Sequence, residues 1–167
     1  MRSEWVPKGE CQHVLAALMP ENRLACELSL ATGLRINDVL SLKTEQLKNQ
    51  RFTIKEQKTG KTRSVYIPAD LYRRILAVSG KIYVFEHRLD GKKHRTRQAV
   101  FKDLKRAAAA FRVSENVTPH SLRKIYAVCE YEKNHDLKRV QKLLNHADEA
   151  VTMIYAMANI VRRRKKA

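Results

Sequence analysis

The chain has 167 residues and a formal net charge of +17, from 34 Lys and Arg against 17 Asp and Glu. Its hydrophobic content of 44% argues against disorder, and its length suits a single domain over residues 1–167 with a real core. The excess of positive charge indicates a polyanionic partner, nucleic acid before membrane, although ribosomal and lipid-surface proteins are also basic.

Cysteine usage and hydropathy narrow the class further. The three cysteines form no CxxC pair and stand at no metal-ligand spacing with the six histidines, so we interpret them as reduced packing residues. There is no apolar run of about 18 residues and no signal segment. The sequence therefore predicts a cytoplasmic protein outside the membrane, and no metal or other cofactor is expected.

The first third of the chain has a helical pattern. Apolar residues recur at helical spacing and predict helices over residues 7–18 and 21–32, which separate near Pro20. Gly33 ends the second of these helices. Residues 36–43 begin another short helix.

The middle of the chain changes to the two-residue period of strands. Residues 51–57 alternate like a strand, KTGK follows as a turn, and residues 63–68 form a second strand. A β-hairpin is therefore predicted. Residues 69–78 are predicted as a helix and residues 82–86 as a short strand.

The last part of the chain returns to helix. Thr118 is a good N-cap and Pro119 a good first helical residue. A basic tail is expected over residues 159–167. The predicted helices are residues 96–111, 118–133, 136–144 and 149–158. The fold class is α+β: mostly helix, with one small antiparallel sheet.

His146 and Tyr155 stand nine residues apart, with a helix-breaking stretch directly after the histidine. On one unbroken helix, their side chains would face opposite ways. Asn145 tolerates the left-handed backbone that ends a helix, and Asp148 is a good N-cap for a new one. The predicted break therefore allows both rings to turn toward one site.

The stretch TPHSLR offers a phosphate site. His120 and Arg123 are three residues apart in the first turn of a helix, so they share one face. Free backbone N–H groups at the positive end of a helix dipole attract phosphate. Taken alone, the pair also fits an exposed capping histidine and a surface arginine.

Arg35 stands at the junction between two apolar segments, directly after Gly33 and Leu34. A guanidinium there is expected to be partly buried, which requires a partner. Asp38, three residues on, is the obvious local candidate. The arrangement fits either a structural Arg–Asp pair or a bidentate phosphate ligand held by that carboxylate.

Lys58 and Tyr155 complete the set of reactive groups. Lys58 lies at the tip of the hairpin, where it is either a solvated turn lysine or an ammonium that reaches into a groove. Tyr155 follows apolar residues on a short helix and could simply pack there. Together with the residues above, these groups suit metal-free phosphoryl transfer: arginines neutralise a phosphorane, a cation protonates the leaving oxygen and a phenol attacks. No carboxylate cluster suited to Mg²⁺ accompanies them.

Four segments, in this order and spacing, resemble the catalytic domain of the tyrosine recombinases, the phage integrase family. The resemblance runs from about residue 8 to residue 158 and implies the fold of the DNA breaking-rejoining enzymes. The segments are ATGLRINDVLSLK (31–43), KTGKTRSVYIP (58–68), VTPHSLRKIYA (117–127) and LLNHADEAVTMIYA (143–156).

The resemblance implies a role for each residue that matches a motif. Arg35 and Arg123 would bind the scissile phosphate, and Asp38 would support the site. Lys58 would protonate the departing 5′ oxygen. His120 would act as general acid and base near the nucleophile.

The last motif implies the remaining two roles. His146 would hydrogen-bond the phosphate, and Tyr155 would be the nucleophile that forms a 3′-phosphotyrosyl link. The chain departs from the family at Asn145, where glycine is frequent, and at Lys124, where a histidine often follows the second arginine. An upstream helical domain that clamps the DNA is usual in the family and is expected to be absent here. DNA binding should then be weak and salt-sensitive.

Further basic residues crowd the hairpin, the loop before the helix at residues 96–111, and that helix itself. We assign them to contacts with the phosphate backbone of DNA, with little direct reading of bases. For each of them the alternative is a solvated surface side chain. They are Lys61, Arg63, Lys92, Lys93, Arg95, Arg97, Lys102, Lys105 and Arg106.

The leading hypothesis is a site-specific DNA recombinase or integrase of the tyrosine type. It would act on double-stranded DNA as a homo-tetramer on two synapsed sites, and as a monomer in isolation. One alternative is a type IB topoisomerase-like enzyme that relaxes DNA by the same covalent chemistry. Others are a DNA-binding regulator that has lost catalysis and a generic basic nucleic-acid-binding module.

Overall fold

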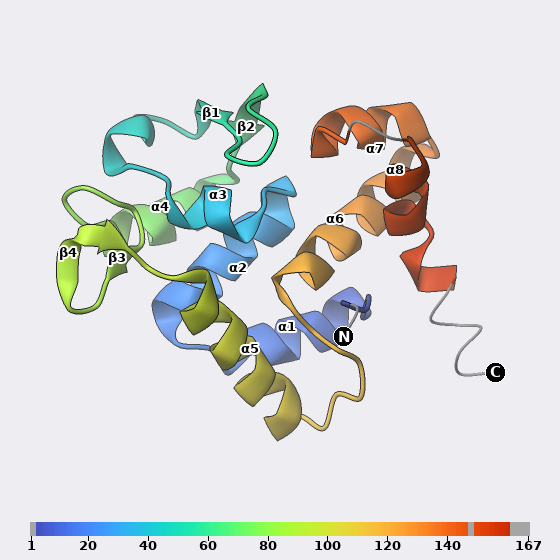
Figure 1. Cartoon of the computed structure of the whole chain (residues 1–167), viewed down its shortest axis with the longest axis horizontal. Coiled ribbons are helices and arrows are strands. Elements are labelled where there is room, and N and C mark those ends of the chain that lie inside the picture. The colour runs from blue at the N-terminus through green and yellow to red at the C-terminus, as the bar shows by residue number, and fades with distance from the viewer. Residues whose placement is uncertain (1–2, 147–148, 161–167) are drawn as a thin grey trace.

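The computed structural model describes residues 3–146 and 149–160. Within these ranges the chain is mostly helical, with two small antiparallel hairpins at its edges (Figure 1). The predicted α+β class is confirmed, although two separate two-stranded sheets replace the single predicted one. None of the helices in this part of the chain is long and apolar enough to span a membrane.

The N-terminal helices follow the predicted pattern. Helix α1 covers Lys8–Ala16, α2 covers Pro20–Thr32 and α3 covers Ile36–Leu40. Gly33 ends α2 in the left-handed conformation, with φ of 69°, and its N–H donates to the carbonyl of Ser29. The third helix is shorter than predicted, and a 3-10 turn at Thr44–Gln46 follows it.

The predicted hairpin is confirmed. Strand β1, Arg51–Lys55, pairs antiparallel with β2, Thr62–Tyr66, so that Phe52 lies opposite Val65. Both of these side chains are buried, because alternate residues of each strand face the helices. Helix α4, Ala69–Val78, follows.

The predicted strand over residues 82–86 is wrong. Tyr83 makes only an isolated antiparallel bridge with Lys43, and the buried Val84 and Phe85 form a turn. The strands instead are β3, Glu86–His87, and β4, Asp90–His94, which form a second hairpin. Part of the basic segment expected in a loop therefore lies on a strand.

The C-terminal half contains helices α5, Arg97–Ala110, and α6, Pro119–Asn134. The predicted start of α6 is confirmed, because the Thr118 side chain accepts a hydrogen bond from the N–H of His120 at 3.2 Å. Pro119 is the first residue of the helix, as predicted.

Helices α7, Leu137–Leu144, and α8, Glu149–Ala156, lie against the C-terminal half of α6 (Figure 1). Asn145 ends α7 in the left-handed conformation, with φ of 51°, as its sequence position predicts. The predicted N-cap at Asp148 and the tail beyond residue 160 lie outside the described residues.

Most of the core lies between α2 and the helices around it. Buried aliphatic side chains from α1 to α6 and the first hairpin form one continuous cluster. A second, small cluster of Ala127, Val140 and Leu144 joins α6 to α7, and Tyr155 packs against it. Cys11 and Cys26 are buried and Cys129 is half-buried, all as free thiols, which agrees with their interpretation as packing residues.

Candidate active site

A pocket of about 380 Å³ lies where α3, the turn of the first hairpin and the start of α6 meet. Four of the six candidate catalytic side chains line it, together with Asp38. Among the described residues, no group of three His, Cys, Asp or Glu could hold a metal ion. The candidate catalytic residues in the wall of this pocket are Arg35, Lys58, His120 and Arg123.

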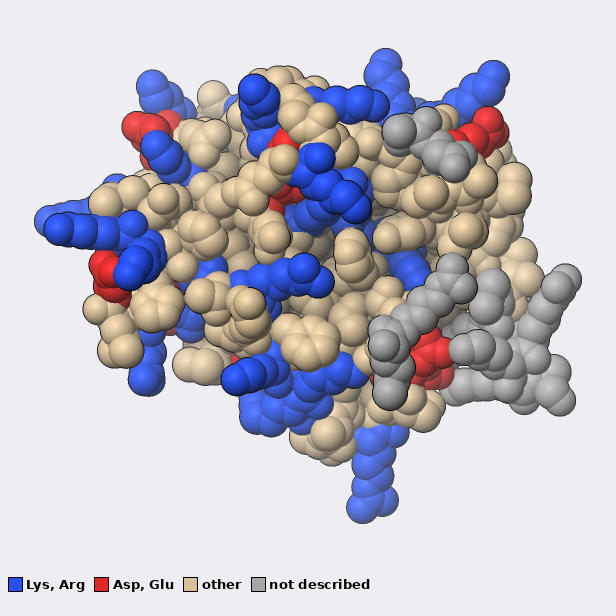
Figure 2. Space-filling view, in the orientation of Figure 1, with Lys and Arg blue, Asp and Glu red and all other residues tan. Residues whose placement is uncertain are grey.

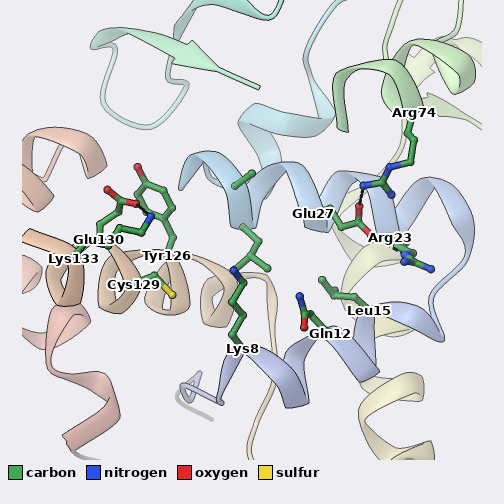
Figure 3. Close-up of a pocket in the computed structure, with 12 residues that line it drawn as sticks. Lys8, Gln12, Leu15, Arg23, Glu27, Arg74, Tyr126, Cys129, Glu130 and Lys133 are labelled. Carbon is green, nitrogen blue, oxygen red and sulfur yellow. Dashed lines mark hydrogen bonds and ion pairs between the residues drawn. The ribbon is translucent and has the colours of Figure 1, made fainter. Parts of the chain in front are cut away.

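A larger cavity, of about 570 Å³, contains none of the candidate catalytic residues. It lies between α1, α2 and α6, and Figure 3 shows ion-paired side chains around it. There Glu27 binds Arg23 at 2.7 Å and Arg74 at 2.6 Å. The candidate catalytic residues that line a cavity therefore belong to the smaller pocket.

Arg35 is the N-cap of α3, and its side chain is only 16% exposed. Its Nη1 donates to the carboxylate of Glu56. The predicted pairing with Asp38 is wrong. Asp38 is turned toward the hairpin instead, where its Oδ1 accepts from the N–H of Gln57 at 2.9 Å. Asp38 therefore holds the backbone next to Lys58.

Glu56 is a residue of the site that no sequence motif singles out. Its side chain is completely buried, at 0% exposure. Besides Arg35 it accepts from the Asn145 side chain at 3.1 Å and lies 3.7 Å from a nitrogen of Arg63. The two-residue period of β1 contained the signal, because Glu56 falls on the same inward face as Phe52 and Ile54.

Arg123 and Arg63 connect the ends of two helices. Arg123 is 1% exposed, and its guanidinium donates to the carbonyls of Gly33, after α2, and Leu144, at the end of α7. Arg63 donates to the carbonyls of Thr32 and Leu143 in the same two places. The last carbonyls of a helix lack partners within the helix and carry partial negative charge, so two cations satisfy them.

His146 and Tyr155 converge, which resolves the question raised by their spacing. Their rings lie 5.0 Å apart at 78°, an edge-to-face contact. Nδ1 of His146 lies 3.1 Å from the hydroxyl of the buried Thr152, and its Nε2 lies 3.4 Å from Nη2 of Arg123. Neither ring lines the pocket itself, but Arg123 joins them to it. The Lys124 ammonium lies 5.7 Å from the centre of the Tyr155 ring.

Burial and nearby cations shift the titration of the site. The pKa of His146 is lowered from 6.5 to about 4 by desolvation, and then by Arg123 and Arg35. The pKa of His120 is lowered for the same two reasons. Desolvation also lowers the pKa of Arg123 to about 10, which keeps it charged at neutral pH. At pH 7 the site therefore combines neutral imidazoles with charged guanidinium groups.

We expect acid to destabilise the fold partly through His146. Its pKa is lower in the folded chain, so the unfolded chain binds more protons between about pH 6.5 and pH 4, and stability falls as the pH falls through that window. We expect the substitution His146→Gln to remove about 2 kcal/mol of this pH dependence, since each unit of pKa shift is worth about 1.4 kcal/mol before solvent screening.

Urea denaturation at several pH values between 4 and 7 measures this effect. The matched control is His13→Gln, because His13 is exposed on α1, away from the site. Equal pH dependence in His146→Gln and wild type would contradict the assignment.

The predicted DNA-contacting residues divide into two groups. Arg97, at the start of α5, lines the pocket beside Lys58 and His120. Lys61, Lys92, Lys93 and Lys102 are exposed. Figure 2 shows one face of the molecule. Lys and Arg side chains are spread over it and around its hollow centre, with few Asp or Glu among them.

Other members of the predicted set bind protein groups. Arg63 is occupied by helix carbonyls as described above, and Arg95 is buried and donates to Asn22 at 2.6 Å and to Glu21 at 3.2 Å. The expectation that Arg63 and Arg95 contact DNA does not fit their positions, because both guanidinium groups point into the protein and bind protein groups there. Lys105 donates to Asn116, and Arg106 binds Asp103 and a carbonyl at the end of α1.

Comparison with known proteins agrees with this geometry. The model of the phage integrase family matches residues 4–161. The chain is 31% identical over 162 residues to a tyrosine recombinase of Thermosipho africanus, covering 91% of this chain and 56% of that protein. It is 34% identical to the tyrosine recombinase XerD of Lacticaseibacillus casei, covering 80% and 49%.

Solved structures give the same result. The crystal structure of the XerH site-specific recombinase bound to its difH substrate superposes with a TM-score of 0.71 at 27% identity, over 90% of this chain and 50% of that one. The chain thus spans about half the length of the curated relatives it matches. Over nearly its whole length, it belongs to the phage integrase family of tyrosine recombinases.

Proposed function

We propose that the chain is the catalytic domain of a site-specific DNA recombinase that cuts one strand of double-stranded DNA through Tyr155. The observation that carries this proposal is the meeting of Arg35, Lys58, His120 and Arg123 at one pocket, with the His146–Tyr155 pair joined to it through Arg123. Membership of the family supports the same reaction.

In the proposed reaction the phenol oxygen of Tyr155 attacks the scissile phosphorus. The phenol proton passes to the imidazole of His120, whose lowered pKa leaves it neutral and able to accept it. The P–O5′ bond breaks as the P–O(Tyr) bond forms. The departing 5′ oxygen takes a proton from the ammonium of Lys58 and leaves as a 5′-hydroxyl.

Charge stabilisation falls to the arginines. Arg35 and Arg123 are desolvated cations in fixed positions, so they can stabilise the added negative charge of the pentavalent phosphorane without reorganising. His146 is held at Nδ1 by the Thr152 hydroxyl, and its Nε2–H would donate a hydrogen bond to a phosphate oxygen once the phosphate replaces the contact of Nε2 with Arg123. Strand exchange reverses these steps, when the 5′-hydroxyl of a second DNA strand attacks the phosphotyrosine and releases Tyr155.

The reaction needs two DNA sites and, we propose, four protomers. Basic side chains around the pocket favour the phosphate backbone of double-stranded DNA, and the nearby Arg97 is the first such contact we assign. Exposed apolar side chains on α8, Val151, Met153 and Ile154, could pack against a neighbouring protomer in that assembly.

Covalent trapping tests the proposal. We would incubate the protein with a pool of nicked DNA duplexes, randomised in sequence around the nick, that lose a short fragment when cleaved. We expect a complex that resists denaturation with wild type and none with Tyr155→Phe, since phenylalanine has no nucleophilic oxygen. The matched control is Tyr131→Phe, because Tyr131 packs in the same small cluster.

The recovered DNA distinguishes the remaining alternatives. A narrow set of cleaved sequences supports a recombinase, whereas cleavage without sequence preference would instead indicate a topoisomerase-like enzyme. A complex that persists in Tyr155→Phe would contradict the assignment of the nucleophile. DNA binding without any covalent complex would contradict the proposed reaction.

A further inference from the structure

We propose that Glu56 is a positioning residue of the reaction: it sets the orientation of Arg35 and fixes the lysine-bearing hairpin to the turn that precedes His146. Glu56 touches no substrate in this scheme and acts through its neighbours. The inference rests on the proposed function for its consequences, but its structural basis is independent of it.

Glu56 lies among cations. Its carboxylate is completely buried and receives a hydrogen bond from Nη1 of Arg35, while a nitrogen of Arg63 lies 3.7 Å away. A buried carboxylate is stable as an anion only when paired and hydrogen-bonded, and here two guanidinium groups meet that need. Because Arg35 gives one terminal nitrogen to Glu56, its remaining N–H groups keep a fixed direction relative to the pocket.

Glu56 also holds the base of the first hairpin's turn. The backbone of Glu56 closes the turn: its N–H donates to the carbonyl of Lys61 at 2.9 Å, and its carbonyl accepts from Gly60 at 2.8 Å. The hydroxyl of Thr59 lies 3.4 Å from the same carboxylate. Lys58 stands at the exposed tip of this turn. The base of the turn is therefore fixed while the side chain of Lys58 stays free to reach the leaving oxygen.

Glu56 links the hairpin to the segment that carries His146. The Asn145 side chain donates to Glu56 at 3.1 Å, and Asn145 is the left-handed residue directly before His146. Arg63 strengthens the same link, since it binds the Leu143 carbonyl on one side and lies beside Glu56 on the other. One carboxylate thus joins three segments that are distant in sequence.

The experiment compares Glu56→Gln and Glu56→Asp with wild type. Glutamine keeps the size but loses the charge, and its amide would direct a donor at other donors. With DNA recovered from the trapping experiment, we expect the rate of covalent complex formation to fall about 100-fold in Glu56→Gln, the loss typical of a displaced catalytic group. Glu56→Asp should recover part of the rate, and DNA affinity should change little in either variant.

An uncharged substrate distinguishes a loss of Arg35 orientation from a non-specific loss of activity. Arg35 is needed to neutralise phosphate charge, so replacing the scissile phosphate by an uncharged methylphosphonate removes that need. We expect the defect of Glu56→Gln to shrink to a few-fold on this substrate. A defect of equal size on both substrates would overturn the inference, as would a wild-type rate for Glu56→Gln on the ordinary phosphate.

The matched control is Glu27→Gln. Glu27 is also a largely buried carboxylate held by two arginines, but it lies beside the larger cavity, away from the active site (Figure 3). It should lower thermal stability without the selective loss on phosphate. A similar substrate-dependent loss in Glu27→Gln would overturn the inference.

A measurement without DNA keeps this inference separate from the proposed function. Nitrogen-15 NMR of the Arg35 side chain reports how fast its guanidinium rotates. We expect slow rotation in wild type and Glu27→Gln and fast rotation in Glu56→Gln. If wild type forms no Tyr155-dependent complex, the proposed reaction fails, and the NMR result still decides whether Glu56 orients Arg35.

Discussion

The substitution Gly33→Ala will lower the free energy of unfolding by about 3 kcal/mol. Gly33 has a φ of 69°, a left-handed conformation that costs an L-residue about 1–2 kcal/mol. A Cβ added there would also lie 2.5 Å and 2.6 Å from two ring carbons of Tyr126. Overpacking of this kind costs about 1–3 kcal/mol, and the two penalties add.

The chain contains a matched control for the conformational part. Gly60 has a φ of 65°, but an added Cβ would meet nothing within 4 Å. We expect Gly60→Ala to lose only about 1 kcal/mol, because it pays the left-handed penalty alone. Urea denaturation of both variants measures the difference. Equal losses would mean that Tyr126 moves aside without cost.

The substitution Gly33→Ala should also displace a residue of the candidate active site. Its carbonyl accepts a hydrogen bond from Arg123, so a displaced helix end would carry that guanidinium with it. We therefore expect the folded fraction of Gly33→Ala to cleave DNA more slowly than Gly60→Ala does, relative to wild type.

The second large effect is expected at Arg123. The substitution Arg123→Lys keeps the charge but cannot reach the carbonyls of both Gly33 and Leu144. An unsatisfied buried carbonyl costs about 1–3 kcal/mol, so we expect a stability loss of about 2–3 kcal/mol. Cleavage should fall by about 100-fold or more, the usual effect of losing one donor to a developing oxyanion.

Lys58→Ala is the comparison for Arg123→Lys. Lys58 is exposed, so its loss should slow cleavage without lowering stability. Urea denaturation and the rate of covalent trapping, measured on the same preparations, give both quantities. Wild-type stability in Arg123→Lys would show that the two carbonyls find other donors, and the bridging role would then be wrong.

Helical periodicity and capping made most of the fold predictable. The first hairpin followed from alternation around KTGK, and the start of α6 followed from Thr118 and Pro119. The strand predicted over residues 82–86 failed, because a run of apolar residues does not reveal whether the backbone pairs with a partner strand. Tyr83 makes only an isolated bridge, residues 84–85 form a turn, and the second hairpin begins at Glu86.

The site was predictable where its residues are close in sequence. His120 and Arg123 share a helix face, as their spacing indicates. The partner of Arg35 was not predictable in this way, since it is 21 residues distant and the nearby Asp38 offered an equally acceptable charge. Alternation within the strands holds part of this information, because it turns both Glu56 and Arg63 inward.

The bridge that Arg123 makes between two helix ends has a consequence for mutational tolerance. Because Arg123 supports the fold in addition to its proposed contact with phosphate, its loss should lower the amount of folded protein. Lys58 and Tyr155 are less buried, so their loss should lower that amount less. In a scan that scores abundance and cleavage separately, Arg123 should be intolerant on both scales. A lineage that abandoned catalysis would therefore be expected to lose its lysine or tyrosine first and to keep this arginine longest.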